Sequence, residues 1–309
     1  MHCRGRHACF ARLNAMRVFI SGSASHLARA LLPRLCDDPA IESVLGLDIQ
    51  PGWFEHRKYR HVQADLRDIS LAPLLQDCDG LVHLAFVVLR GKTPENAMRA
   101  INLNASQRLF AAASAAGVTR QVHLSSAAVY GSGVLVNEAA PLKPIPGFLY
   151  GEHKAELEHW LASHYPDVVR LRPHIILGAH AQPLLKTLLH QPFYVRLPDP
   201  QPLLQCVHED DVAAAIILAL RQPATGAYNL AADDSFSFRD AIRARSCVAV
   251  PIAPKLAGAA LKLVWGMTGA GGEPGWMEGV HQSLTLDCSR ARNELGWRPL
   301  HTSRGMLTR

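Results

Sequence analysis

The sequence predicts an α/β fold: a doubly wound parallel sheet with a smaller, mostly C-terminal lobe for a substrate. Three observations support this expectation. Apolar runs of strand length alternate with segments of helical periodicity as far as Pro173, a turn of small residues joins the first run to the first helical segment, and proline-spaced sequence interrupts the alternation afterwards. Because such a succession favours right-handed crossovers, the strands should lie parallel, with helices on both faces.

The first unit is the run RVFIS at 17–21, followed directly by HLARALLPRL. The run is continuously apolar and ends in small residues, as expected for a parallel strand covered on both faces, and the second segment repeats apolar residues at helical spacing. The later units, in chain order, are 43–48, 60–65, 71–77, 80–85, a long helix at 97–117, a strand at 121–126, a helix at 150–164 and the unit at 168–173. Ligands of such sheets bind outside the carboxyl ends of the strands.

The sequence after Pro173 is punctuated by proline and glycine. The segment QPFYVRLPDPQPLLQ interrupts the alternation before CVHEDDVAAAIILAL restores one strand edge and one helix. We therefore predict a dinucleotide-type sheet domain from 16–173 and 204–231, and a substrate-binding lobe from 174–203 and 232–309.

The composition fits a soluble globular protein. Of the 309 residues, 49% are hydrophobic and 19% are charged, which allows a sizeable core. No window reaches about 18 uninterrupted apolar residues, so no transmembrane span is predicted and the expected location is the cytoplasm. Residues 1–15 contain no acid and no apolar stretch of signal-peptide length, and we expect a disordered extension before a start at Met16 rather than at Met1.

Charge and cysteine usage argue against two kinds of site. The net charge is +6, but lysine and arginine are dispersed rather than gathered in a basic run with aromatic residues, so nucleic-acid binding is not expected. The seven cysteines lie far apart without a CxxC pair, and the sixteen histidines form no ligand pair such as HExxH. We therefore predict no metal site.

A group of polar side chains is predicted to meet at the carboxyl edge of the sheet. Ser125 and Ser126 close one strand. Tyr150 and Lys154 stand four residues apart near the start of a helix, so they share one face. A tyrosine hydroxyl with a pKa of about 10 is a poor base, but a nearby ammonium stabilises its phenolate. Tyr150 could then remove a proton from a substrate alcohol while hydride leaves its carbon, with Ser126 hydrogen-bonding the same oxygen.

A series of short motifs carries a family resemblance. They are SGSASHLA (21–28), LGLD (45–48), ADLRD (64–68), VHLAF (82–86), INLNAS (101–106), SSAAVYG (125–131), YGEHK (150–154), LRP (171–173), VHEDDVAAAI (207–216) and LDCSRARNELGWRP (286–299). From Met16 to about Pro299 the chain resembles the extended short-chain dehydrogenases/reductases of the NAD-dependent epimerase/dehydratase group. The resemblance implies a Rossmann-type fold and an NAD-dependent enzyme.

The resemblance also implies a set of site residues. Ser126, Tyr150 and Lys154 would form the catalytic triad, and Ser126, His174 and Arg290 would contact the substrate. The residues placed at NAD are Gly22, Ser25, His26, Leu27, Asp48, Ile49, Asp65, Leu66, Leu84, Ala85, Phe86, Asn102, Tyr150, Lys154 and Pro173. Asp48 has an argument of its own, because a carboxylate about 20 to 30 residues after the glycine turn accepts ribose hydroxyls and repels a 2′-phosphate. NADP is therefore less expected than NAD.

The turn after the first strand departs from the family pattern T-G-x-x-G-x-x-G. Gly22 keeps the first glycine, and Ala28 replaces the third with one added methyl. Ser25 stands at the second, where the backbone approaches the pyrophosphate, and a positive φ there would cost about 1 kcal/mol or more. Its hydroxyl can donate to a phosphate oxygen, and the helix N-terminus still offers N–H groups. We interpret the turn as a modified pyrophosphate site.

Two alanines narrow the expected chemistry. Ala127 and Ala128 stand where dehydratases of the family carry an acidic pair and sugar-acid decarboxylases carry a glutamate. Elimination and decarboxylation are therefore disfavoured, which leaves alcohol/ketone oxidoreduction, as a net reaction or as the transient step of an epimerisation. The leading substrate is a sugar nucleotide or a related small molecule, with Arg196, Arg290 and Arg292 as candidate ligands of its diphosphate.

Two other functions stay open. The apolar segment KLAGAALKLVW at 255–265 favours a dehydrogenase or reductase of a lipophilic alcohol or ketone, such as a sterol-like or phenolic compound. The loss of two glycines from the turn suits a non-catalytic NAD-sensing protein, although such a protein has no need of Tyr150 and Lys154. The family resemblance further implies a homodimer through the helices at 97–117 and 150–164.

Overall fold

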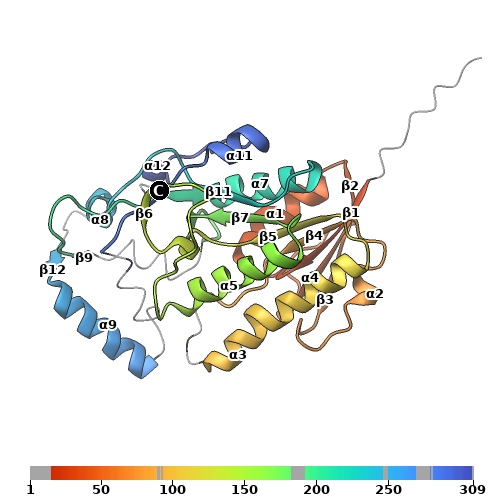
Figure 1. Ribbon diagram of the computed structural model, residues 1–309, viewed down its shortest axis with the longest axis horizontal. Helices are drawn as coiled ribbons and strands as arrows, with labels where there is room; N and C mark the ends of the chain where they lie inside the picture. The colour runs from red at the N-terminus through yellow and green to blue at the C-terminus, as the bar shows by residue number, and fades with distance from the viewer. Residues whose placement is uncertain are drawn as a thin grey trace, which may run out of the picture.

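The computed structural model describes residues 15–88, 91, 93–181, 192–245, 250–268, 279 and 281–307. Within these residues a central sheet lies between layers of helices, and a smaller group of strands and helices lies beyond the carboxyl ends of the central strands (Figure 1). The extension predicted at 1–15 falls, apart from Ala15, outside the described residues.

The central sheet confirms the predicted doubly wound fold. Its order is β11-β7-β5-β4-β1-β2-β3, and every neighbouring pair is parallel. The strands are β1 (Met16–Ser21), β2 (Ile41–Asp48), β3 (Tyr59–Gln63), β4 (Gly80–His83), β5 (Arg120–Leu124), β7 (Val169–Pro173) and β11 (Ala227–Leu230). The chain builds outward from β1 through β2 to β3, then returns to β4 on the other side of β1. The strand order therefore reverses between β1 and β4, which is where doubly wound sheets bind their ligands.

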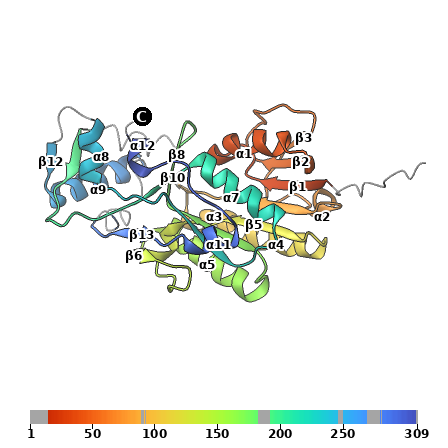
Figure 2. The same cartoon turned by 90° about the horizontal axis from the view of Figure 1, so that it is seen from above.

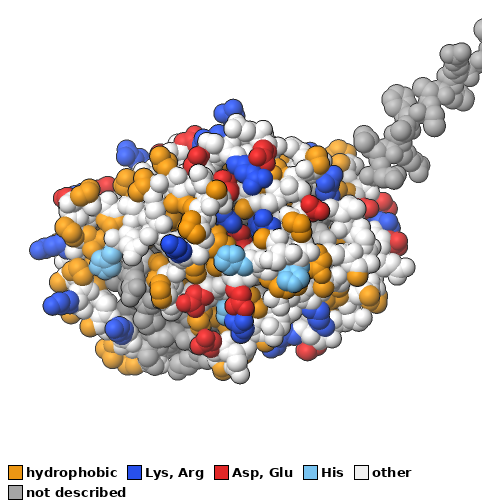
Figure 3. All heavy atoms as spheres, viewed as in Figure 1, with side chains coloured by type: hydrophobic (Ala, Val, Ile, Leu, Met, Phe, Trp, Pro, Cys, Tyr) orange, Lys and Arg blue, Asp and Glu red, His pale blue; other side chains and the backbone are white. Residues whose placement is uncertain are grey.

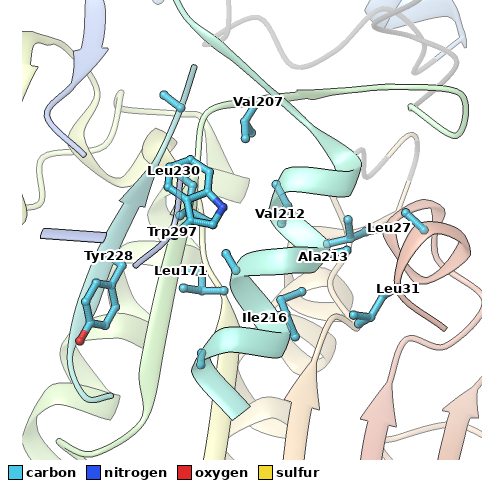
Figure 4. Close-up of a cluster of buried hydrophobic side chains, with 14 of the residues drawn as sticks. Leu27, Leu31, Leu171, Val207, Val212, Ala213, Ile216, Tyr228, Leu230 and Trp297 are labelled. Atoms are coloured by element: carbon cyan, nitrogen blue, oxygen red, sulfur yellow. The ribbon is translucent and has the colours of Figure 1, made fainter. Parts of the chain in front are cut away.

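Both faces of the sheet are buried, as the apolar run of the first strand predicts. Val18 and Ile20 point into one hydrophobic core, and Phe19 points into the other. Successive strand residues point to opposite faces, so a strand covered on both sides carries no polar alternation. Figure 4 shows the first core, where Leu27 and Leu31 face Ala213 and Ile216.

The helices divide between the two faces. The first core is covered by α1 (His26–Asp37) and α7 (Glu209–Arg221), and the second by α4 (Ser106–Ala115) and α5 (Leu149–His164), as Figure 2 shows from above. The long helix predicted at 97–117 is present as α3 (Glu95–Arg99), a π-helical stretch η1 (Ala100–Ala105) and α4. The shorter elements are α2 (Ala72–Leu75), the 3₁₀ turn η2 (Ala127–Tyr130), α11 (Ser289–Glu294) and α12 (Ser303–Leu307).

Three two-stranded sheets connect the later segments. β8 (Ile175–Leu177) pairs with β10 (Cys206–His208), β6 (Gly133–Val136) with β13 (Leu284–Leu286), and β9 (Phe193–Val195) with β12 (Val250–Ile252). The β9 and β12 pair joins the two segments expected in the lobe, and α8 (Phe238–Arg245) and α9 (Pro254–Thr268) lie beside it (Figures 1 and 2). The exact domain boundaries stay a prediction.

Candidate active site

The turn after β1 is fixed by its neighbours at the carboxyl edge. Gly22 has a φ of +78°, and a Cβ there would lie 2.5 Å from the backbone nitrogen of Ala85, just beyond the end of β4. Only glycine tolerates both the left-handed backbone and this approach. The Ala24 N–H donates to Asp48 Oδ2 over 2.9 Å, which ties the turn to the end of β2. The turn therefore lies at the point where the strand order reverses.

Ser25 does not carry the strain that a second-glycine position suggests. Its φ is −65° and its ψ is 162°, an extended conformation that any residue adopts, and it is the N-cap of α1. Its Oγ accepts the Ala28 N–H over 3.4 Å, so the serine caps the helix that a phosphate would approach. Because the φ of Ser25 is negative, the strain energy expected for a positive φ at this position is absent. His26 is exposed and Leu27 is buried in the first turn of the helix.

The loop between β2 and β3, together with His61 of β3, supports the turn through contacts that no sequence motif indicates. The Trp53 indole N–H donates to the Ser23 carbonyl over 3.1 Å, and the Arg29 guanidinium lies 4.9 Å from the Trp53 ring centroid. The Ser23 hydroxyl hydrogen-bonds His61 Nδ1 at 3.2 Å. Nothing in the local spacing signals these contacts, because they join residues 30 and 38 positions apart across two strands.

Asp48 and Asp65 lie on the β2 and β3 side of the turn. The second Asp48 oxygen accepts the Gln50 N–H over 2.9 Å, and the neighbouring Ile49 side chain is 60% exposed. Asp65 pairs with Arg67 at 2.6 Å, and this hydrogen bond lowers the pKa of the Asp65 carboxyl. Leu66, next in the chain, is buried. These residues form a polar rim with one exposed apolar side chain.

Asn102 fixes the segment that follows β4. Its Oδ1 accepts the Val87 N–H over 2.7 Å, and its Nδ2 donates to the Val87 carbonyl over 3.0 Å. The amide is fully buried in the π-helical stretch. The clamp holds the chain next to Phe86, with Leu84 buried and Ala85 half-buried on the way from β4. Asn102 therefore positions the segment after β4, and its place at NAD stays a prediction.

Ser126, Tyr150 and Lys154 come together where β5 ends and α5 begins. Ser126 caps η2 by accepting the Ala128 N–H over 3.2 Å. Tyr150 is the second residue of α5, and Lys154 follows one turn later with its Nζ 5.8 Å from the Tyr150 ring centroid. The ammonium lies 3.5 Å from the Phe86 ring centroid and donates to the Leu124 carbonyl over 2.5 Å. The i, i+4 spacing thus places both side chains on the face that meets β5.

Burial dominates the electrostatics of these groups. It raises the pKa of Tyr150 to about 12, and a hydrogen bond with the Ser126 side chain opposes the rise. It lowers the pKa of Lys154 well below its usual range, and the Glu158 carboxylate opposes that fall. In both cases the low-dielectric surroundings disfavour the charged form. The resting Tyr150 hydroxyl therefore carries its proton at neutral pH.

A buried ion pair supports α5, the helix that carries Tyr150 and Lys154. Glu158 lies one turn after Lys154 in α5, and its carboxylate accepts Arg172 Nε at 2.9 Å and Nη2 at 2.5 Å. The Ser125 hydroxyl donates to the same carboxylate over 2.5 Å. The side chains of Glu158 and Arg172 are only 1% and 6% exposed. The hydroxyl of Ser125, the first of the two strand-end serines, is therefore engaged with Glu158. Ser126 is the serine that remains available to the candidate site.

His174 follows Pro173 at the end of β7, but its ring is fully engaged with the backbone. Its Nδ1 accepts the Ile175 N–H over 2.8 Å, so Nε2 carries the proton and donates to the Leu284 carbonyl over 2.9 Å. Burial lowers the pKa of His174 to about 4. The ring connects the start of β8 to β13 through these hydrogen bonds. Neither ring nitrogen is left for the substrate contact that the family resemblance implies.

The structure does not bring Arg290 to the carboxyl edge. Its guanidinium donates to the carbonyls of Thr225 and Ala227 over 3.2 and 3.1 Å, where β11 begins rather than ends. Its Nε also pairs with Glu294 at 3.1 Å. The helix that carries Arg290 runs alongside β11. Sequence spacing could not reveal this placement, because it does not say which end of that strand the helix accompanies. Arg292 pairs with Asp233, and Arg196 continues from β9 in the predicted lobe.

Two further kinds of feature are absent from the described part of the chain. It contains no cluster of three or more His, Cys, Asp or Glu side chains arranged to hold a metal ion. None of the described helices has the length and apolar character needed to cross a bilayer.

Comparisons with known proteins match this geometry. The sequence model of the NAD dependent epimerase/dehydratase family matches residues 18–231, which include the turn, Ser126, Tyr150 and Lys154. The chain belongs to this family. A Mycobacterium tuberculosis protein named only as uncharacterized is 26% identical over 313 residues, which cover 93% of this chain and 81% of that protein. A 4-hydroxy-2-methyl-3-oxo-4-farnesyl-3,4-dihydroquinoline-1-oxide ketoreductase of Stigmatella aurantiaca is 30% identical over 193 residues, 56% of this chain and 54% of its own.

Solved structures share the fold over nearly the whole chain of this family member. MoeE5 in complex with UDP-glucuronic acid and NAD superposes with a TM-score of 0.75 at 21% identity, covering 94% of this chain and 96% of MoeE5. The UDP-glucuronic acid 4-epimerase from Bacillus cereus in complex with NAD gives a TM-score of 0.73 at 20% identity, covering 95% and 96% of the two chains. The Rossmann-type architecture is thereby confirmed. The expected homodimer and cytoplasmic location stay predictions.

Proposed function

We propose that the protein is an NAD-dependent oxidoreductase or epimerase that interconverts a secondary alcohol and a ketone, with Tyr150 as the general acid and base. One observation carries the proposal: Ser126, Tyr150 and Lys154 meet at the carboxyl edge of the sheet, beside the point where the strand order reverses. Parallel strands lie about 4.8 Å apart, so β5 and the turn after β1 are about 10 Å apart along this edge. A dinucleotide binds across such an edge.

The residues at the edge fit a dinucleotide. The turn at Gly22 leaves no room for a Cβ, Ser25 caps the helix whose N-terminus would face a pyrophosphate, and the Asp48 carboxylate retains lone pairs for ribose hydroxyls. Ile49 offers an exposed apolar surface beside Asp48. The family membership and the NAD-bound structural neighbours support NAD as the group held there. Bound NAD would accept or return the hydride.

The chain's own residues would handle the proton. Tyr150, with a pKa of about 12 in its buried setting, holds a proton that it can donate to the oxygen of a ketone as the alcohol forms. In the reverse direction it takes that proton back, and Lys154, whose charged form the Glu158 carboxylate favours against the effect of burial, stabilises the phenolate when the lysine is protonated. Ser126 hydrogen-bonds the same substrate oxygen. The burial of these groups strengthens each interaction by excluding water.

The leading substrate is a nucleotide sugar, and the reaction is an epimerisation through a transient ketone. Two structural neighbours that match nearly the whole chain support this assignment, because MoeE5 is in complex with UDP-glucuronic acid and the Bacillus cereus enzyme is a UDP-glucuronic acid 4-epimerase. Ala127 and Ala128 place no acidic side chain directly after Ser126, so proton donation to a leaving hydroxyl lacks its group. A dehydratase reaction is therefore not proposed.

A second candidate is net reduction of a lipophilic ketone. It is favoured by the farnesyl-dihydroquinoline ketoreductase, which shares 30% identity with a little over half of this chain. It is also favoured by the position of Arg290, which removes one of the arginines expected on a sugar-nucleotide diphosphate.

A substitution at Tyr150 tests the proposed chemistry. Tyr150→Phe should lower kcat by about 10²- to 10⁴-fold, the range of a lost general acid, while calorimetry finds NAD bound as in the wild type. Tyr165→Phe, in the residue that follows α5, is the matched control and should leave turnover unchanged. Wild-type protein without measurable NAD binding, or a Tyr150→Phe variant with wild-type turnover, would refute the proposal.

The two substrate classes separate in one panel. UDP-glucose, UDP-glucuronic acid and UDP-N-acetylglucosamine are incubated with NAD and examined by proton NMR for the epimer. Sterol-like, quinoline and phenolic ketones are incubated with NADH, whose oxidation is followed by absorbance. Epimer formation without net NADH change supports the leading candidate, and NADH consumption with an apolar ketone supports the second.

A further inference from the structure

We propose that α9 docks on the surface of an anionic lipid bilayer and lies in the plane of that surface. The helix presents three large apolar side chains to solvent: Leu256 is 64%, Leu263 62% and Met267 60% exposed. Their spacings of seven and four residues place them in one stripe along the helix. A stripe of this kind has no partner in the described part of the chain, where most other large apolar side chains are packed in two cores.

The charge beside the stripe selects the partner. Lys255 and Lys262 each precede a leucine of the stripe, so both lie along the same edge of it, and both are exposed. The helix sequence PKLAGAALKLVWGMT contains no aspartate or glutamate. The exposed face is therefore apolar with a cationic margin. Anionic lipid headgroups above an acyl layer complement both features at once.

A second copy of the chain complements this surface less well. An antiparallel two-fold contact through the stripe would bring Lys255 and Lys262 of each copy to the same edge as those of the other. No acidic residue of α9 is available to pair with them. The apolar area would be buried, but the like charges would oppose the contact. The charge pattern thus favours a negatively charged surface over another α9.

The position of the helix leaves the surface accessible to a bilayer. Figures 1 and 2 place α9 at the end of the molecule opposite β2 and β3. Figure 3, in the same view as Figure 1, shows apolar and basic side chains next to each other at the lower left edge, where Figure 1 places α9. The helix has 15 residues, about 22 Å in length, which is shorter than the apolar thickness of a bilayer. It therefore suits an in-plane position rather than a span.

Vesicle binding tests the apolar part of the surface. Full-length protein is sedimented with large vesicles of phosphatidylcholine alone or mixed with phosphatidylglycerol. We expect binding to the mixed vesicles, and a partition coefficient at least ten-fold lower for the double variant Leu256→Asp and Leu263→Asp. The control, Leu135→Asp with Leu300→Asp, changes two leucines that are 68% and 86% exposed elsewhere and should bind as the wild type does. Circular dichroism and thermal unfolding confirm that each variant is folded.

A charge-reversal pair tests the cationic margin. Lys255→Glu with Lys262→Glu should abolish the preference for phosphatidylglycerol, whereas Arg60→Glu with Arg298→Glu, in two other exposed basic residues, should reduce it by less than two-fold. Added salt should weaken wild-type binding. Absence of binding to the mixed vesicles, or equal losses in variants and controls, would overturn the proposal. If a stripe variant changed only the sedimentation velocity of the protein and not its binding to vesicles, the surface would contact a second copy of the chain instead.

Discussion

His174→Gln should remove a measurable part of the acid sensitivity of folding. In the folded protein the ring is buried with its pKa lowered to about 4, against 6.5 for an exposed histidine. The unfolded chain therefore binds a proton between pH 6.5 and pH 4 that the folded chain does not. The stability contributed by the neutral ring is complete above pH 6.5 and is lost as the pH falls through this window. Glutamine keeps a donor within reach of the Leu284 carbonyl but has no proton to take up.

The magnitude follows from the displaced pKa. Each unit of pH below 6.5 costs about 1.4 kcal/mol, so the wild type should lose about 2 kcal/mol through His174 between pH 7 and pH 5. Urea unfolding at pH 7, 6 and 5 gives the free energy of unfolding for both proteins. Between pH 7 and pH 5 the free energy of unfolding of the wild type should fall by about 2 kcal/mol more than that of the variant, because only the wild type carries this titration. His83, buried with its pKa lowered to about 3, contributes equally to both curves and cancels.

Parallel free-energy curves for the two proteins would refute the assignment of a neutral, backbone-bound His174. The kinetics provide a second check. If His174 only connects strands, the His174→Gln variant should have an unchanged KM for substrate at pH 7. If His174 contacts the substrate, the variant should have a raised KM. A raised KM with parallel curves would restore the substrate contact that the family resemblance implies for this residue.

Three further substitutions test the supports of the site. Gly22→Ala should destabilise the protein by more than about 2 kcal/mol and abolish NAD binding, because it combines a positive φ with a backbone clash; urea unfolding and calorimetry measure the two effects. Trp53→Phe should raise the Kd for NAD by about two- to ten-fold through loss of one hydrogen bond to the turn, whereas Trp160→Phe should not; equal Kd values would contradict this support of the turn. Glu158→Ala should lower the free energy of unfolding by about 3 to 5 kcal/mol, because it leaves the Arg172 guanidinium buried and unpaired, and a loss below about 1 kcal/mol would show that the pair is dispensable.

The sheet and the meeting of Ser126, Tyr150 and Lys154 were predictable because their signals are local; the catalytic role of the three residues stays a prediction. Strand-length apolar runs report burial on both faces, and the i, i+4 spacing of Tyr150 and Lys154 already places them on one helical face. The conformation of Ser25 was not predictable from its position in a glycine pattern, because backbone angles depend on where the helix begins. Here the helix begins one residue later, which makes Ser25 its cap.

The remaining differences come from contacts between distant segments. Arg290 lies in a short helix whose sequence does not state which end of β11 it accompanies, and the structure places it at the beginning of that strand. His174 carries the same chemistry in a substrate site and in a backbone-bound position, and only the Leu284 carbonyl, 110 positions away, distinguishes the two. Trp53 gives no sequence signal for the same reason, since its partner Ser23 lies on another strand's loop.

The π-helical stretch at Ala100–Ala105 constrains how relatives of this protein can vary in length. A π turn accommodates one residue more than an α turn, and it places Asn102 toward Val87. Deleting one residue on the N-terminal side would allow an uninterrupted α-helix, yet it would turn the amide by about 100° away from its backbone partner. A gain in helix regularity would thus release the segment after β4. Insertions and deletions should therefore be tolerated in the loops at either end of this helix long before they are tolerated within it.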